Sequence, residues 1–430
     1  MESQNCNCRD TSIIEGIYAI SRLEILNDYE LLYLQKHLPT KYSTILLTVI
    51  TLGATIISLK CPDKYGKPAD IALGFDHLKG YLSFNQNPFI GCILGRCANL
   101  IKDGYFTMKG RGYQLTLNDL GRRVWESHIA DCCVIMTYLS PDGEEGYPGA
   151  LLTTVRFRLT ADNQLDISMR ATTSKPTIVN LSHGLIFNLA GHKAGEDELK
   201  KHKILLNCDR WTYSEFADPI PTGTIETVGG TIMDLRIPQE LGECLERVSQ
   251  RSRKGDIDQK LNKMIYNRRF QKVSATIIIS ALRETGNQAV YFVLEVYSDQ
   301  PGVQLYTGGR LITEVELEPA PSDSSSYEGE EMGFRISKLN DSFTVCTDEC
   351  CEKMGEDEVG DMYILGKEGA KYRKNCAISI QPQNYPNAIN NVSFSIPLNT
   401  SRVPFFFLAK CTATISLISL DCTLPNTHKI

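Results

Sequence analysis

The sequence lacks both an excess of basic residues and an uninterrupted apolar run of about 18 residues, the length that a membrane-spanning helix needs. Its net charge is −6 and its pI is close to 5.8. Nucleic acids and anionic membrane surfaces are usually bound by basic faces. The sequence therefore predicts a protein that binds neither nucleic acid nor membrane.

The residue order of a secretory signal is also missing, because residues 1–10, MESQNCNCRD, are polar throughout. The 15 cysteines are an odd number and are scattered through apolar segments, which favours buried, reduced thiols over a disulfide framework. A metal site built from Cys6, Cys8, Cys346, Cys350 and Cys351 is the alternative, but the paired spacing with histidines that is typical of zinc sites is absent. We expect a cytoplasmic protein without a metal.

Short segments with the patterning of β-strands are abundant. Val155, Phe157 and Leu159 alternate with polar residues, and the same alternation returns after a polar turn at 161–164. This period of two predicts a half-buried antiparallel hairpin. Similar short segments recur along the chain, which predicts an all-β fold of packed sheets with a few short helices. Helical spacing of apolar residues predicts one such helix, followed by a surface loop, within residues 238–272.

Three regions differ in composition. Residues 1–44 carry apolar residues at a spacing close to that of a helix, and we expect an N-terminal extension there. Regular β patterning spans residues 45–425 and predicts one domain. Residues 314–361 are acidic, rich in serine and poor in apolar periodicity, which predicts a solvated insertion that interrupts this domain.

Two stretches indicate where a functional site lies. Residues 140–149, SPDGEEGYPG, combine proline and glycine in turns at both ends of an acidic loop. Residues 179–189, VNLSHGLIFNL, place a histidine and two asparagines in a run that is otherwise apolar. Buried polar side chains need hydrogen-bond partners or a ligand. We therefore expect residues 179–189 to form a candidate active-site strand.

These stretches, together with several others in the same order and spacing, resemble the aldose 1-epimerase (galactose mutarotase) family over roughly residues 45–400. The other matching stretches are GRCAN at 95–99, IPTG at 220–223, DLR at 234–236, QPGVQLYTG at 300–308 and QNYPNAIN at 383–390.

The resemblance implies a large twisted β-sandwich with a sugar cleft across one sheet. The implied reaction interconverts the α and β anomers of a free hexose such as galactose or glucose, without a cofactor or metal. A carboxylate base takes the proton of the anomeric hydroxyl while an imidazolium acid protonates the ring oxygen, so that the ring opens and closes again.

Matching the family's motifs residue by residue implies that Asn99, Asp234 and Gln304 bind the sugar. Leu100 stands where the family has a sugar-binding arginine. The family's loop with a first histidine should lie between residues 117 and 125, where this chain is shorter and has no histidine.

The acid and base positions are substituted as well. An ungapped match of residues 179–189 puts Gly184 on the acid position, and His183 lies one residue early. A displacement of one residue turns a strand side chain to the opposite face unless a β-bulge corrects it, so a hydrogen-bonded core or edge histidine is the alternative to a catalytic His183. Gln381 stands on the base position, and an amide does not take up a proton near neutral pH.

Three functions are consistent with this pattern. The first is an aldose 1-epimerase-like protein that binds a hexose and has weak or no activity. The second is an active hexose mutarotase that uses a displaced His183, with His192 or Asp258 near the cleft. The third is a protein-interaction module, in which the acidic insertion at 314–361 binds a basic partner.

Overall fold

The computed structural model describes most of the 430-residue chain. The described residues are 12–14, 18–26, 29–37, 44–63, 65–82, 89–116, 126–130, 133–160, 164–214, 220–251, 264–266, 277–285, 288–308, 311, 355–356, 362–394 and 409–420.

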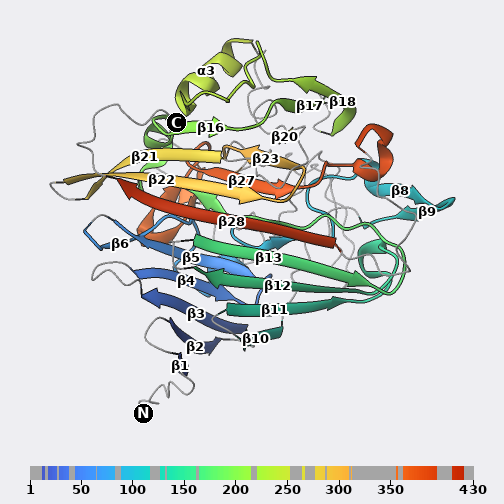
Figure 1. The fold of residues 1–430 in the computed structure, drawn as a ribbon, viewed down its shortest axis with the longest axis horizontal. Coiled ribbons are helices and arrows are strands. Elements are labelled where there is room, and N and C mark those ends of the chain that lie inside the picture. Colours follow the sequence, from blue (N-terminus) through green and yellow to red (C-terminus); the bar gives the residue numbers. More distant parts are fainter. Residues whose placement is uncertain are drawn as a thin grey trace, which may run out of the picture.

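The largest element is a nine-stranded antiparallel sheet, whose strands lie one above another in Figure 1. In spatial order it contains β10 (Glu126–Ala130), β11 (Cys133–Ser140), β12 (Leu151–Leu159), β13 (Gln164–Thr173), β28 (Ala409–Leu420), β22 (Gln288–Ser298), β21 (Ile277–Thr285), β16 (Lys203–Leu206) and β19 (Gln239–Glu240). Strand β28, which is the last in the sequence, lies between β13 and β22 in the middle of the sheet.

Two six-stranded sheets accompany it. The first has the order β1 (Ser12–Ile14), β2 (Tyr18–Leu26), β3 (Tyr29–His37), β4 (Thr44–Ile50), β5 (Thr55–Pro62) and β6 (Pro68–Asp70). The second has the order β15 (Ile186–Phe187), β27 (Ile378–Gln383), β23 (Gly302–Tyr306), β20 (Met264–Tyr266), β17 (Arg210–Ser214) and β18 (Pro221–Thr227).

The remaining described elements are short. Strand β7 (Ile93–Leu94) pairs with β14 (Ser182–His183), β8 (Tyr105–Met108) pairs with β9 (Arg111–Gln114), and β24 (Gly355–Glu356), β25 (Met362–Leu365) and β26 (Lys371–Tyr372) form a small sheet. The described α-helices are α1 (Leu78–Leu82), α2 (Gly195–Lys200) and α3 (Leu241–Arg251).

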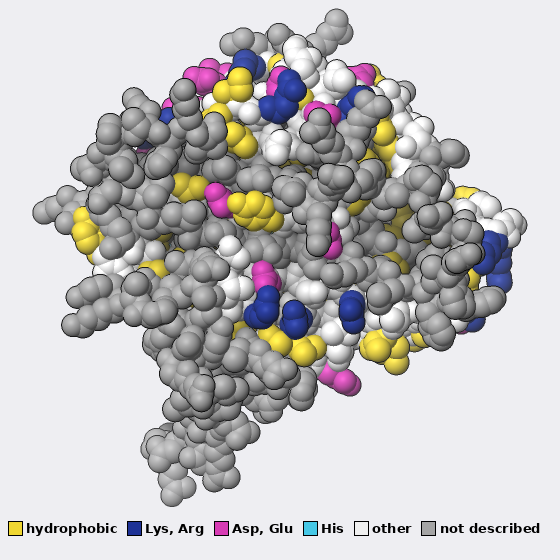
Figure 2. Space-filling view, viewed as in Figure 1, with side chains coloured by type: hydrophobic (Ala, Val, Ile, Leu, Met, Phe, Trp, Pro, Cys, Tyr) yellow, Lys and Arg dark blue, Asp and Glu magenta, His cyan; other side chains and the backbone are white. Residues whose placement is uncertain are grey.

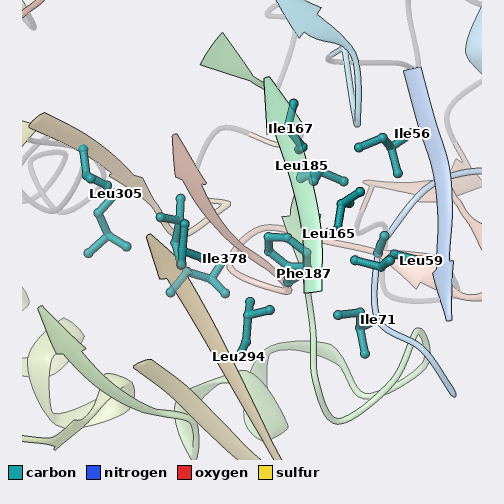
Figure 3. Close-up of a cluster of buried hydrophobic side chains, with 14 of the residues drawn as sticks. Ile56, Leu59, Ile71, Leu165, Ile167, Leu185, Phe187, Leu294, Leu305 and Ile378 are labelled. Carbon is teal, nitrogen blue, oxygen red and sulfur yellow. The ribbon is translucent and has the colours of Figure 1, made fainter. Parts of the chain in front are cut away.

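The main hydrophobic core lies between the nine-stranded sheet and the two six-stranded sheets. Figure 3 shows Leu165 and Ile167 of β13 facing Ile56 and Leu59 of β5, with Leu185 among them. Side chains of β22, β23 and β27 continue the same core. This packing of sheet faces confirms the predicted all-β class and the β-sandwich with few helices.

The predicted hairpin over residues 151–173 is confirmed. Strands β12 and β13 pair from Leu151 with Thr173 to Leu159 with Leu165, and buried and more exposed residues alternate along both. The outward residues include Arg156 and Arg158, and Figure 2 shows basic side chains over this part of the molecule. The outer face of the sheet is therefore polar here, whereas its inner face enters the core.

Helix α3 confirms the helix expected within 238–272. Leu241, Cys244 and Leu245 are buried on one side of it, which is the spacing of an amphipathic helix. The loop expected after it lies largely outside the described residues.

The interpretation of the apolar spacing in residues 1–44 as helical was wrong. Strands β2 and β3 occupy much of this region, and Leu32 and Leu34 of β3 are fully buried in the main core. Strand β3 pairs with β4 from Leu31 with Ile50 to His37 with Thr44, across the expected boundary. An extension ending at residue 44 stays a prediction about chain organisation. The insertion at 314–361 lies outside the described residues apart from β24.

Candidate functional site

Two glutamines lie side by side on neighbouring strands of the second six-stranded sheet. Gln304 of β23 pairs with Gln381 of β27, so both side chains are on one face of the sheet. Val303, Leu305 and Ile380 point from the other face into the main core and fix the orientation of both strands. The alternation of residues on β23 and β27 therefore presents a pair of amides on the face away from the core.

Asn99 reaches this pair from a turn. Its φ is +67°, a left-handed conformation that asparagine tolerates better than most residues. Its Oδ1 accepts a hydrogen bond from the Leu100 N–H at 2.9 Å, and its Nδ2 donates to Gln304 Oε1 at 3.0 Å. We call Asn99, Gln304 and Gln381 the amide cluster, and the structure brings these three predicted residues together.

The three residues of the amide cluster differ in solvent exposure. Asn99 is exposed, Gln381 is partly buried, and only 8% of Gln304 is exposed. Gln381 donates from Nε2 to Ser379 Oγ at 3.2 Å. Amides donate and accept hydrogen bonds, as a sugar hydroxyl also does, but they exchange no proton near neutral pH.

Asp234, the third predicted sugar ligand, has a different set of partners. Its carboxylate forms a bidentate ion pair with Arg236, with both N···O distances at 2.7 Å. The hydrogen bonds from Arg236 hold the pKa of Asp234 below its usual value. None of the contacts among the described residues joins Asp234 to the amide cluster.

His183 lies in the core. It is 0% exposed, and it shares a strand face with Leu181 and Leu185, which belong to the main core. Figure 3 shows Leu185 among the core side chains. Neither ring nitrogen of His183 has a hydrogen-bond partner, and burial lowers its pKa to about 4. His183 is therefore a core histidine, as in the alternative to a catalytic role, but it lacks the hydrogen bond expected for it among the described residues.

Gly184, which the sequence match puts on the predicted acid position, is held closely by a neighbouring segment. Its N–H donates to Cys92 O at 2.7 Å, and its carbonyl accepts from the Gly91 N–H at 2.8 Å. A Cβ atom added at Gly184 would lie 2.7 Å from Phe89 O, which is closer than real Cβ contacts. The backbone as it stands has no room for a histidine side chain at this position.

His192, another candidate for the cleft, has partners outside the amide cluster. His192 is buried, with Nε2 3.8 Å from Asp70 Oδ2 and Nδ1 3.4 Å from the Tyr372 hydroxyl. Asp258 lies outside the described residues.

Arg96 is a residue whose role the sequence did not indicate. It is 8% exposed and fastens the acidic turn at 140–149: Nε donates to Ser140 Oγ at 2.8 Å, Nη1 to Gly149 O at 2.9 Å and Nη2 to Pro141 O at 2.8 Å. Its position three residues before Asn99 links this turn to the segment that carries the amide cluster. An arginine inside the apolar run 89–101 was the available signal.

A buried ion pair was also missed. Lys367 Nζ lies 2.8 Å from Asp70 Oδ2 and donates to Ala72 O at 2.7 Å, with the Lys367 and Asp70 side chains only 8% and 9% exposed. Asp70 also accepts from Ser58 Oγ at 2.8 Å. Burial lowers the pKa of Lys367. The pair joins β6 to the segment between β25 and β26, and no spacing in the sequence connects these residues.

Comparison with known proteins agrees with this architecture. The family model described as aldose 1-epimerase matches residues 37–401. Galactose mutarotase of Bos taurus is 30% identical over 357 residues, which cover 80% of this chain and 84% of that protein. Galactose mutarotase of Homo sapiens is 30% identical over 358 residues, with the same coverage. Aldose 1-epimerase of Escherichia coli is 29% identical over 278 residues, or 62% of this chain and 76% of that protein.

Solved structures show the same fold. An aldose epimerase homologue from C. elegans superposes with a TM-score of 0.63 at 20% identity, over 89% of this chain and 98% of that one. Galactose 1-epimerase from Lactobacillus acidophilus has a TM-score of 0.61 at 18% identity, over 94% and 98%. The chain belongs to the aldose 1-epimerase family, and its fold is that of galactose mutarotase-like proteins. Among the described residues, no helix is long and apolar enough to cross a membrane.

Proposed function

We propose that this chain is a hexose-binding member of the family in which anomer interconversion is weak or lost. The observation that carries the proposal is the amide cluster: the described residues at the family's acid and base positions, Gly184 and Gln381, have no side chain that gives or takes a proton near neutral pH. The cluster keeps hydrogen-bonding groups suited to a sugar while it lacks the chemistry of ring opening.

Anomer interconversion requires two opposed proton transfers. Loss of a positioned general acid or base typically lowers a rate by ~10² to 10⁴. Gln381 can hold a hydroxyl but leaves its proton in place, and Gly184 contributes only backbone atoms. We therefore expect a sugar bound at this site to keep its ring closed far longer than in an enzyme with both groups.

Binding is assigned to Asn99 and Gln304, with Asp234 as a carboxylate for a sugar hydroxyl. The Asn99–Gln304 hydrogen bond leaves one Asn99 Nδ2 hydrogen available for a ligand. The ion pair with Arg236 occupies part of the hydrogen-bonding capacity of Asp234, which becomes fully available to a sugar when the pair opens. This ion pair is partly exposed, so its opening has a low energetic cost.

The test combines two measurements on the wild-type protein. Titration calorimetry with galactose and with glucose reports binding, and a polarimetric assay that starts from pure α-galactose reports anomer interconversion. We expect measurable binding of at least one hexose and a rate close to the spontaneous one. A rate enhancement typical of enzymes would contradict the loss of activity, and absence of binding to both sugars would contradict the proposal as a whole.

The rival, an active mutarotase that uses His183, has less support. A general acid must reach the ring oxygen and carry its proton near neutral pH. His183 faces the core, and its pKa is lowered to about 4, so it is uncharged at pH 7. If the protein proves active, His183→Ala tests this rival directly, since a displaced acid predicts loss of turnover.

A cytoplasmic location is a further part of the proposal. Cys61, Cys208 and Cys376 are buried free thiols, as expected in a reducing compartment. Burial raises the pKa of Cys208 to about 12, which keeps its thiol protonated and unreactive. Docking of a protein partner by the 314–361 insertion stays a prediction, because that segment lies outside the described residues apart from β24.

A further inference from the structure

Gln383 is a fully buried amide. It is 0% exposed, and neither its Oε1 nor its Nε2 has a hydrogen-bond partner among the described residues. A buried amide normally satisfies most of its hydrogen-bonding groups, because leaving them unpaired away from water destabilises the protein. An amide with no partner at either end therefore needs an explanation.

The position of Gln383 supplies one. On β27, Ile378 and Ile380 enter the main core, so Ser379, Gln381 and Gln383 point to the opposite face. Gln383 pairs with Gly302, two residues before Gln304 on β23. It thus lies on the same face as the amide cluster and one step further along it. These side chains therefore extend from exposed Asn99, past Gln304 and Gln381, to fully buried Gln383.

Elsewhere this protein does satisfy a buried amide. Asn188 is 2% exposed, its Nδ2 donates to Cys376 O at 2.8 Å, and its Oδ1 accepts from the Ala190 N–H at 3.0 Å. Asn188 and Gln383 are buried to a similar extent, but only Asn188 has hydrogen-bond partners. A general shortage of partners in the interior therefore does not explain the unpaired amide of Gln383. Gln383 lies on the sheet face that carries Gln304 and Gln381 of the amide cluster.

We propose that Gln383 is an additional sugar-contacting residue, whose amide binds two neighbouring ring hydroxyls of a hexose at the inner end of the site. This inference rests on the proposed function. One amide offers a carbonyl acceptor and N–H donors side by side, and neighbouring hydroxyls offer a matching donor and acceptor. Gly302, opposite Gln383, has no side chain on that face.

The proposal makes binding and stability respond in opposite directions. Gln383→Met keeps the length of the side chain and removes its polar atoms. Without ligand, the variant should be at least as stable as the wild type, because no unpaired amide stays buried. Its affinity for the hexose should fall about tenfold, since two hydrogen bonds of ordinary strength are lost. A purely structural glutamine predicts the reverse, with lower stability and unchanged affinity.

The experiment measures the dissociation constants for galactose and glucose by calorimetry and the thermal midpoint without sugar. It uses the wild type, Gln383→Met, Gln383→Asn and two controls. Gln300→Met changes a partly buried glutamine that bonds to the neighbouring Asp299 and lies outside the amide cluster, and should alter neither quantity. Asn188→Leu removes a satisfied buried amide and should lower the midpoint, which shows that the assay detects such a loss. Gln383→Asn keeps an amide but shortens it, so it tests the contact if the Met variant does not fold.

Each outcome has one meaning. Binding by the wild type that weakens in both Gln383 variants supports the inference. Equal affinities of a folded Gln383 variant and the wild type overturn it and leave the proposed function standing, with internal water as the partner of this amide. If the wild type binds neither hexose, the proposed function fails and the assignment of Gln383 fails with it.

Discussion

Gly184 and Phe89 approach so closely that a Cβ atom on Gly184 would lie 2.7 Å from the Phe89 carbonyl oxygen. The obstacle is backbone rather than the flexible end of a side chain, so it cannot move aside alone. The present backbone therefore requires a glycine at position 184, and a larger side chain there requires a change in residues 89–92 too.

We predict that Gly184→Ala destabilises the protein by ~1–3 kcal/mol, the usual cost of forcing an extra carbon into a packed site. Urea unfolding followed by circular dichroism measures this. The matched control is Gly229→Ala, where the nearest atom to an added Cβ is Arg236 Nη2 at 3.4 Å, and we expect a change within ~0.5 kcal/mol. Similar stabilities of the two variants would contradict the prediction and show that the backbone of residues 89–92 can shift at little energetic cost.

His183 should make stability depend on pH. Its pKa is about 4 in the folded protein, whereas an unfolded histidine titrates near 6.5, so the unfolded chain binds the extra proton between these values. The stability from keeping it neutral is complete above about pH 6.5 and declines as the pH falls toward 4, with a slope of up to ~1.4 kcal/mol per pH unit. His183→Leu should remove this contribution in urea titrations at pH 7 and pH 5, whereas exposed His77→Leu should not. A slope that is the same in His183→Leu and the wild type contradicts the prediction.

The buried pair of Lys367 and Asp70 should matter far more than a surface pair. Lys367→Met leaves the Asp70 carboxylate buried without its cation, which typically costs ~3–5 kcal/mol. Lys200→Met breaks a comparable contact with Glu196, but both side chains are more than 40% exposed and the expected loss is ~0–1 kcal/mol. Chemical denaturation of both variants at pH 7 compares them. Equal losses would mean that the Lys367 site is open to water.

Sugar affinity should depend on the amide cluster more than on Asp234. Gln304→Met removes a side chain that bonds to Asn99 and should weaken hexose binding by ~3- to 10-fold, the effect of one or two neutral hydrogen bonds. Asp234→Asn should have a smaller effect, because the carboxylate is engaged by Arg236. Calorimetric titration ranks the two. A larger effect of Asp234→Asn would place the main contacts on the Asp234 side of the site.

The sequence predicted the features that follow from local periodicity. Alternation on β12 and β13 gave the hairpin, and apolar spacing gave helix α3, because both patterns report which side of an element is buried. The same reasoning failed for β2 and β3, where apolar residues three apart fitted a helix although the two segments pair with each other, and β3 with β4, as antiparallel strands. Short apolar segments are compatible with either period, and the pairing partner decides between them.

Motif matching found the members of the amide cluster but not their environment. The sequence placed Asn99, Gln304 and Gln381 in one site, and hydrogen bonding and strand pairing bring them together. It could not show that His183 lacks a partner, that Gln383 is unpaired, or that Lys367 meets Asp70. Each of these depends on contacts between segments that are far apart in the sequence, which no local pattern records.

The place of β28 has a consequence for how the chain folds during synthesis. This strand follows both β13 and β22 in the sequence and is synthesised after them, yet it fills the gap between them. Until it arrives, two partial sheets expose unpaired backbone along the edges that β28 will join, and such edges invite pairing with other chains. Closure of the sheet by pairing between segments so far apart in the sequence favours slow folding. The exposed edges make the incomplete chain prone to aggregation, which chaperone binding would limit.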